Sequence, residues 1–138
     1  MEETLAFRIV CLYKYFLAYS RKELKKLGVS FGQLPFILYA GKHPGCSQKE
    51  LTEGIRIDWG YSQRTITKLA ENGLILKESG EDQNYHLSLT ETGEKVFALS
   101  HELFRNWDEK QTGSLSESER RELSRLLDEL LQGKGAEL

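Results

Sequence analysis

Apolar residues recur every three to four positions near the start of the chain, which predicts an amphipathic helix over residues 5–27. Gly28 suits the left-handed position that ends such a helix. The apolar stripe consists of Leu5, Ile9, Leu12, Phe16, Tyr19 and Leu27, flanked by Val10, Tyr13 and Leu17. Because one small core cannot cover a helix that is apolar on more than one side, the pattern indicates that this helix also contacts a second chain.

Two further helices are predicted near the end of the chain. The first follows Thr90 and ends before Gly113, and a capping box that starts at Ser116 opens the second. The apolar positions of the last helix are Leu123, Leu126, Leu127, Leu130 and Leu131. Leucines at this spacing in a terminal helix indicate packing against a large apolar surface. Residues 134–138 are predicted to form a disordered tail.

The middle of the chain begins with a shorter helix, predicted over residues 30–41. A capping box between Ser30 and Gln33 opens this helix. Pro35 lies just past the first turn, where it removes one helical hydrogen bond and favours a bend. A His-Pro-Gly turn follows, and Ser47 then caps the next helix.

A winged helix-turn-helix pattern completes this middle region. A short turn leads into a helix over residues 58–72, and Gly73 ends that helix. Residues 74–78 are then predicted to pair with residues 85–89 around a loop at 79–84. The expected fold is therefore mainly α with a small β-hairpin wing, and the usual work of such a fold is to bind DNA.

The helix at 58–72 has two faces of different chemistry. Ser62, Ile66 and Leu69 share the face that we expect to be buried. The opposite face presents Gly60, Arg64 and Lys68, with Tyr61, Gln63, Thr65 and Thr67 beside them. Arginine pairs with guanine and glutamine with adenine in the major groove, so this face is predicted to read DNA. Trp59 and Tyr61 either pack at the start of the helix or touch DNA.

Composition and charge set limits on this hypothesis. A chain of 138 residues corresponds to one domain, and a formal net charge of −2 is not typical of a nucleic-acid-binding protein. Basic residues in the first helix and acidic residues in the last third of the chain indicate that charge is segregated. No apolar run approaches the roughly 18 residues of a membrane span, and the acidic start differs from a secretory leader. We therefore expect a cytoplasmic protein with reduced thiols and no membrane association.

The sequence offers little for catalysis or metal binding. It has no nucleophile–base constellation, no Gly-rich phosphate loop and no cluster of histidines, so neither an enzyme nor a metal or cofactor site is predicted. Cys46 precedes a helix N-terminus, where a thiol can become reactive, but packing against Leu51 is the favoured interpretation. Core packing is favoured for Cys11 as well.

Four segments resemble the MarR (multiple antibiotic resistance regulator) transcription factors in order and spacing. They are GVSFGQLPFIL, HPGCSQKEL, IDWGYSQRTITKLAENGLI and LSLTETGEKVF. The last segment carries the family's Leu-Thr-x-x-Gly motif after the wing. The resemblance covers nearly the whole chain.

The resemblance implies a homodimer that binds double-stranded DNA. Residues 1–29 and 91–133 would form its dimerisation helices, and residues 30–90 its DNA-binding lobe, within one domain of residues 1–138. The resemblance assigns DNA contacts to Ser47, Gln48, Gly60, Tyr61, Gln63, Arg64 and Lys68. We assign the dimer contacts to Leu5, Ile9, Leu12, Phe16, Leu123, Leu127 and Leu130. The resemblance also implies repression at a palindromic operator and release by a small effector of unknown identity.

The predicted wing departs from the family pattern. The family's Asp-x-Arg triplet is replaced by Glu81-Asp82-Gln83, so Gln83 stands where an arginine would enter the minor groove. The acidic wing and the negative net charge motivate an alternative hypothesis. In that alternative, the protein is a winged-helix protein-interaction module that does not bind DNA.

Overall fold

The structure is a computed structural model that describes residues 3–134. Within that range it contains α1 (Leu5–Lys26), α2 (Leu34–Lys42), β1 (Cys46–Ser47), α3 (Gln48–Gly54), α4 (Trp59–Glu71), β2 (Ile75–Ser79), β3 (Tyr85–Leu89), α5 (Glu91–Gln111) and α6 (Glu117–Leu131). The predicted mainly α fold with a small β wing is therefore confirmed. The tail predicted for residues 134–138 lies outside the described residues from residue 135 onward.

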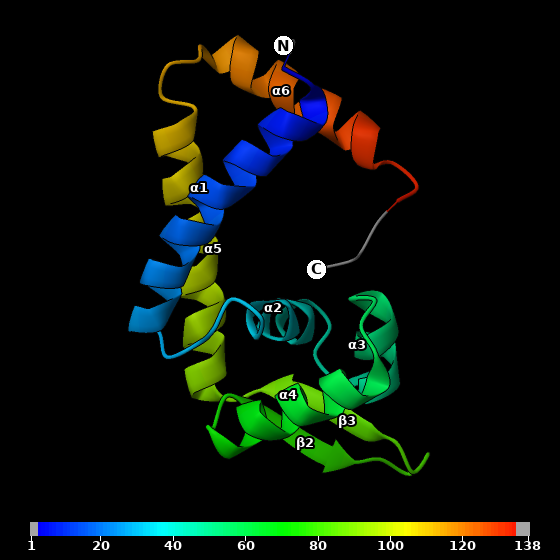
Figure 1. Cartoon of the computed structure of the whole chain (residues 1–138). Helices are drawn as coiled ribbons and strands as arrows, with labels where there is room; N and C mark the ends of the chain where they lie inside the picture. The colour runs from blue at the N-terminus through cyan, green and yellow to red at the C-terminus, as the bar shows by residue number, and fades with distance from the viewer. Residues whose placement is uncertain (1–2, 135–138) are drawn as a thin grey trace.

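The molecule has a long arm and a lobe (Figure 1). Helices α1 and α5 lie side by side along the arm, and α6 follows α5 at its far end. The lobe contains α2, α3, α4 and the hairpin, and α5 leads directly from the hairpin into the arm. No helix in the described part of the chain is both long and apolar enough to cross a membrane.

The lobe and the lower arm have two connected apolar cores. The lobe core contains Leu51, Ile66, Leu69 and Leu87, all fully buried. Leu24 of α1 and Leu103 of α5 form the second core with two leucines of α2, Leu34 and Leu38. The two cores share partly buried neighbours, which ties the base of the arm to the lobe.

The wing is part of a three-stranded antiparallel sheet in the order β1-β3-β2. The third strand was not predicted, because a strand of only two residues, Cys46–Ser47, has no periodicity to detect. The predicted hairpin strand at 74–78 is displaced by one residue, since β2 is Ile75–Ser79. The physical reason is the end of α4, where the amide of Leu74 donates to the Leu69 carbonyl at 2.9 Å and cannot join the ladder.

The prediction that the second helix starts at Ser30 is wrong. Ser30 and Gln33 do make both capping-box hydrogen bonds, at 3.0 and 3.2 Å, but these bonds close a turn that precedes the helix. Helix α2 begins at Leu34, so Pro35 lies in its first turn. An amide is not needed there, and Pro35 therefore starts the helix and does not bend it.

The Leu-Thr-x-x-Gly segment joins the wing to the arm. Thr90 donates from its hydroxyl to the Gly73 carbonyl and from its amide to the Leu74 carbonyl, and it also caps α5 by accepting from the Gly93 amide. A Cβ added at Gly93 would collide with the backbone carbonyl oxygen of Leu74. The first turn of α5 therefore packs directly on the turn between α4 and β2.

Candidate nucleic-acid interface

Helix α4 displays the polar face that the sequence predicted. The Asp58 carboxylate accepts from the Tyr61 amide at 2.9 Å and fixes the start of the helix. On the inner side, Ile66 and Leu69 are fully buried. On the outer side, the exposed residues include Gln63, Arg64, Thr67 and Lys68. The structure thus brings Gln63, Arg64 and Lys68 together on one accessible surface.

Gly60 leaves room for the guanidinium of Arg64. A Cβ added at Gly60 would lie 3.3 Å from the Nη1 atom of Arg64 and 3.3 Å from the Oδ2 atom of Asp58. The Arg64 side chain therefore lies back along α4 toward its first turn. The predicted site residue Gly60 is adjacent to Arg64 in space and makes room for it.

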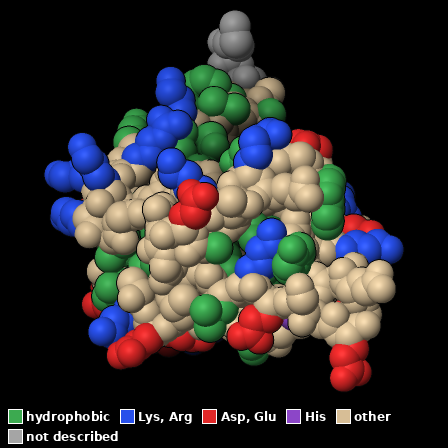
Figure 2. All heavy atoms as spheres, turned by 90° about the horizontal axis from the view of Figure 1, so that it is seen from below, with side chains coloured by type: hydrophobic (Ala, Val, Ile, Leu, Met, Phe, Trp, Pro, Cys, Tyr) green, Lys and Arg blue, Asp and Glu red, His purple; other side chains and the backbone are tan. Residues whose placement is uncertain are grey.

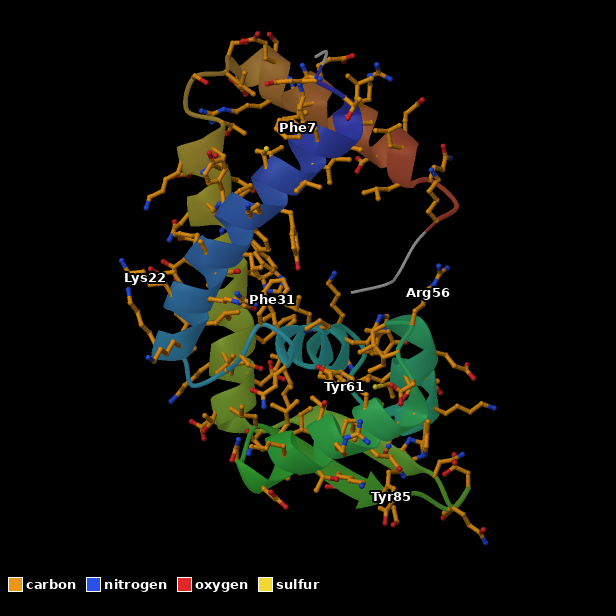
Figure 3. All side chains as sticks on the ribbon, in the orientation of Figure 1. Phe7, Lys22, Phe31, Arg56, Tyr61 and Tyr85 are labelled. Carbon is orange, nitrogen blue, oxygen red and sulfur yellow. The ribbon has the colours of Figure 1, made fainter. Side chains whose placement is uncertain are left out.

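The side chain of Tyr61 is oriented toward α2. Its ring packs on Phe36 of α2 with 6.2 Å between centroids, and its hydroxyl lies beside Gly32. Figure 3 shows Tyr61 between α4 and α2. About 40% of the residue stays exposed. Of the two interpretations of Tyr61, the structure favours packing at the start of α4, whereas Trp59 remains largely exposed.

The side chains of Ser47 and Gln48 face the interior of the lobe. Ser47 is 6% exposed and accepts from the Glu50 amide at 3.0 Å, and Gln48 is 3% exposed. Beside them, the hydroxyls of Thr52 and Ser62 are 2.7 Å apart in a buried contact between α3 and α4. Any phosphate contact at this position therefore falls to the backbone amides at the start of α3, with no part for the Gln48 side chain.

A histidine bridges the wing loop to the turn before β1. The Nε2 atom of His86 is 3.0 Å from the Oδ1 atom of Asp82, and its Nδ1 atom is 3.0 Å from the Gly45 carbonyl oxygen. Both partners are acceptors, so both contacts are hydrogen bonds only when the ring carries two protons. The hydrogen bond to Asp82, followed by that to Gly45, raises the pKa of His86, and the same bond from His86 lowers the pKa of Asp82. Gln83, the predicted minor-groove residue, lies in this loop with a φ of 64°.

A polar groove of about 450 Å³ separates α4 from β2. It is lined by Gln63, Arg64, Thr67, Lys68, Glu71 and Lys77. The ammonium of Lys77 lies 4.2 Å from the centroid of the Tyr85 ring. Sequence reasoning missed Lys77 and Tyr85, because their proximity depends on the strand register. Figure 2 shows from below that cationic and acidic side chains both reach this end of the molecule, with neutral surface between them.

Most of the predicted dimer contacts lie on open apolar surface. Six of the seven are between 41% and 54% exposed, namely Leu5, Ile9, Leu12, Leu123, Leu127 and Leu130. Phe16 differs, because its ring packs inside the protomer against Phe31, Phe104 and Trp107 at centroid distances of 6.1, 5.7 and 5.2 Å.

The thiol of Cys46 lies in the core of the lobe. Cys46 is 5% exposed, and burial together with the nearby Glu50 raises the pKa of its thiol to about 11. The thiol is therefore protonated at neutral pH, which agrees with packing in the core. Across residues 3–134, no three His, Cys, Asp or Glu side chains converge in a way that could hold a metal ion.

A capped helix with an exposed polar face, a preceding helix packed against it and a β wing define a winged helix-turn-helix protein. Comparison with known proteins agrees. The chain is 41% identical over 140 residues to the HTH-type transcriptional regulator BilQ of Clostridium symbiosum (strain WAL-14163), covering 100% of this chain and 97% of that protein. No model of a protein family matches the chain.

Solved structures give the same result. A MarR transcriptional regulator from Methanosarcina mazei Go1 matches with a TM-score of 0.85 at 27% identity, over 97% of this chain and 91% of that one. A putative MarR family regulator from Listeria monocytogenes, solved in complex with a 26mer DNA, matches with a TM-score of 0.78 at 23% identity, over 100% of this chain and 99% of that one. The chain belongs to the MarR family of winged helix-turn-helix transcriptional regulators.

Proposed function

We propose that this protein represses transcription as a homodimer that binds a palindromic operator and is released by a small effector. The observation that carries the proposal is the exposed face of α4, where Arg64 and Lys68 stand beside Gln63 on a helix whose other face is fully packed. The DNA complex of the Listeria relative supports the same use of this fold.

The exposed leucines of α1 and α6 support dimerisation. Both helices reach the far end of the arm in Figure 1, and none of the residues of α6 is buried within the protomer. Leu123, Leu127 and Leu130 form the apolar stripe of α6, and each is more than 40% exposed. A second copy of the chain would remove this surface from water and set two lobes side by side. Two equivalent lobes in turn favour an operator with two related half-sites.

Effector release depends on coupling between the arm and the lobe. A cavity of about 380 Å³ lies where α1 turns into α2 and is lined by Arg21, Lys25, Gly28, Val29, Ser30 and Phe31. Its two cations and the Phe31 ring suit an anionic aromatic ligand. A ligand that favours a lobe spacing unable to span two half-sites weakens DNA binding, and by linkage DNA weakens ligand binding by the same factor.

The test is a selection of genomic fragments with the purified protein at low and at raised salt. We expect a small set of enriched fragments that share two inverted half-sites, with affinity that falls steeply as salt rises. Arg64→Ala should remove the preference among fragments, whereas Lys95→Ala, on an exposed position of α5, should keep it. If the wild-type protein enriches no fragment at low salt, the repressor proposal fails. The protein-interaction alternative, favoured by the acidic Glu81 and Asp82 of the wing, would then stand.

A further inference from the structure

We propose that the groove between α4 and β2 binds the sugar-phosphate backbone of one DNA strand, and that Lys77, held over the ring of Tyr85, is its wing-side phosphate contact. This inference rests on the DNA-binding function proposed above and assigns roles to Lys77 and Tyr85, which neither the sequence patterns nor the comparisons single out. It places the positive charge of the wing on a strand, and not at the tip.

The strand register brings Lys77 and Tyr85 together. Lys77 pairs with Leu87, and Ser79 pairs with Tyr85, so Lys77 and Tyr85 are diagonal neighbours on the same face of the hairpin. Ile75 of β2 lies on this face and is buried, and β2 contacts α4, so the face is turned toward α4. Lys77 is half-buried, and its ammonium reaches the Tyr85 ring at 4.2 Å. The aromatic ring thus orients the ammonium without neutralising its charge.

Lys77 is the one lysine or arginine of the wing, and the other ionisable base, His86, is bonded to Asp82. No other lysine or arginine occurs between Lys68 and Lys95 in the sequence. At the tip, Gln83 is neutral and follows two acids, Glu81 and Asp82, which phosphate would repel. We therefore expect the wing to contact DNA electrostatically through Lys77 of β2.

The cations of the groove are free to meet a polyanion. Among residues 3–134, no carboxylate oxygen lies within 4.0 Å of the side-chain nitrogens of Arg64, Lys68 or Lys77. Arg121 and Arg125 of α6, in contrast, are paired with glutamates of their own helix at 3.1 and 2.7 Å. Glu71 is the one acid that lines the groove against three cations. The local balance of charge favours phosphate.

The experiment measures affinity for an enriched fragment as a function of salt, for the wild type and four variants. Lys77→Gln should weaken binding on all sequences alike and reduce the slope of log affinity against log salt by about one for each wing that engages DNA. Lys77→Arg should restore wild-type behaviour, because it keeps the charge and can stack on Tyr85. Tyr85→Leu should lower affinity less than Lys77→Gln does. Lys95→Gln, which removes an exposed cation outside the groove, should leave the slope unchanged.

Failure of the groove proposal can be distinguished from failure of the repressor proposal. If Lys77→Gln keeps the wild-type slope while the wild type still enriches fragments, the groove proposal is overturned and the repressor proposal survives. A changed base preference in Lys77→Gln would also overturn it, because a phosphate contact carries no sequence information. If Tyr85→Leu binds DNA with wild-type affinity, the ring of Tyr85 does not position Lys77. If the wild type enriches no fragment, both proposals fall together.

Discussion

At Gly93 there is no room for a side chain, because the carbonyl oxygen of Leu74 occupies the place of a Cβ. We expect Gly93→Ala to destabilise the protein by about 1–3 kcal/mol, the usual cost of forcing atoms into a packed site. Unfolding in urea would measure the change in free energy. Thr92→Ala is the matched control, since Thr92 is the exposed neighbour and should change stability little. Equal stability of the two variants would contradict the close contact between α5 and the lobe.

Arg64 illustrates a second property that depends on one residue. A guanidinium can pair with two acceptors of guanine at once, whereas an ammonium cannot. We expect Arg64→Lys to keep general affinity for DNA but to lose about 1–3 kcal/mol of discrimination at one operator position. Lys68→Arg is the control, because we expect Lys68 to contact phosphate as a point charge, and such a contact tolerates the exchange. Binding to fragments with single base changes would measure both, and unchanged discrimination in Arg64→Lys would contradict base reading by this residue.

The wing is an element whose order should depend on pH. The pKa of His86 is raised in the fold, so its bridge to Asp82 contributes fully below the unfolded His pKa of about 6.5 and is lost as pH rises through the folded value. The pKa of Asp82 is lowered, so its contribution is present above about pH 4 and is lost as pH falls through the folded value. The bridge is therefore strongest between about pH 4 and 6.5.

Hydrogen exchange of the wing amides tests this expectation. The amides of Gly80 and Gln83 are bonded inside the loop at 2.9 and 3.1 Å, and their protection, corrected for intrinsic rates, should fall between pH 6 and pH 8. His86→Gln should remove the pH dependence. A His86→Gln variant that keeps the same fall would show that another group controls the loop.

The elements also show what the sequence could and could not predict. The long helices α1, α5 and α6 were predicted within a residue or two. Their apolar residues repeat at helical spacing over many turns, which distinguishes a helix from a strand. Strand β1 was missed because it forms by pairing with β3, which is distant in sequence. The contact of Lys77 with Tyr85 was missed because it depends on the exact register of the hairpin. The start of α2 was misplaced because Ser30 and Gln33 can close a cap on a turn as well as on a helix.

The candidate site shows the same division. The exposed face of α4 follows from helical periodicity, so Gln63, Arg64 and Lys68 could be placed together from the sequence. The burial of Gln48 could not, because it depends on how α3 packs within the lobe. For Phe16, an apolar stripe alone could not separate packing within the arm from contact with a second chain.

At the scale of the whole molecule, the open leucines of α6 predict an obligate contact between two copies. Leu127→Lys should weaken the dimer strongly, since a buried leucine contributes about 1.5–3 kcal/mol and is lost twice in a symmetric interface. This corresponds to roughly two to four orders of magnitude in the dissociation constant. Sedimentation would measure it. Gln132→Lys is the control, because it adds the same charge just past the end of α6, on the side away from its leucines, and should leave the dimer intact. A dimeric Leu127→Lys protein would contradict the assigned interface.

The contact between Gly93 and Leu74 makes α5 a lever. With 21 residues it is about 32 Å long at 1.5 Å per residue. Because its first turn is fixed to the lobe, a tilt of roughly 10° at the far end of the arm would displace α4 by about 5 Å, more than the 3.4 Å rise of one base pair. In the proposed dimer, a small angular change far from DNA is therefore enough to put two reading helices out of step with their half-sites. The angle between the two arms thus determines the distance between the two α4 helices, and DNA binding requires that distance to match the pitch of the double helix.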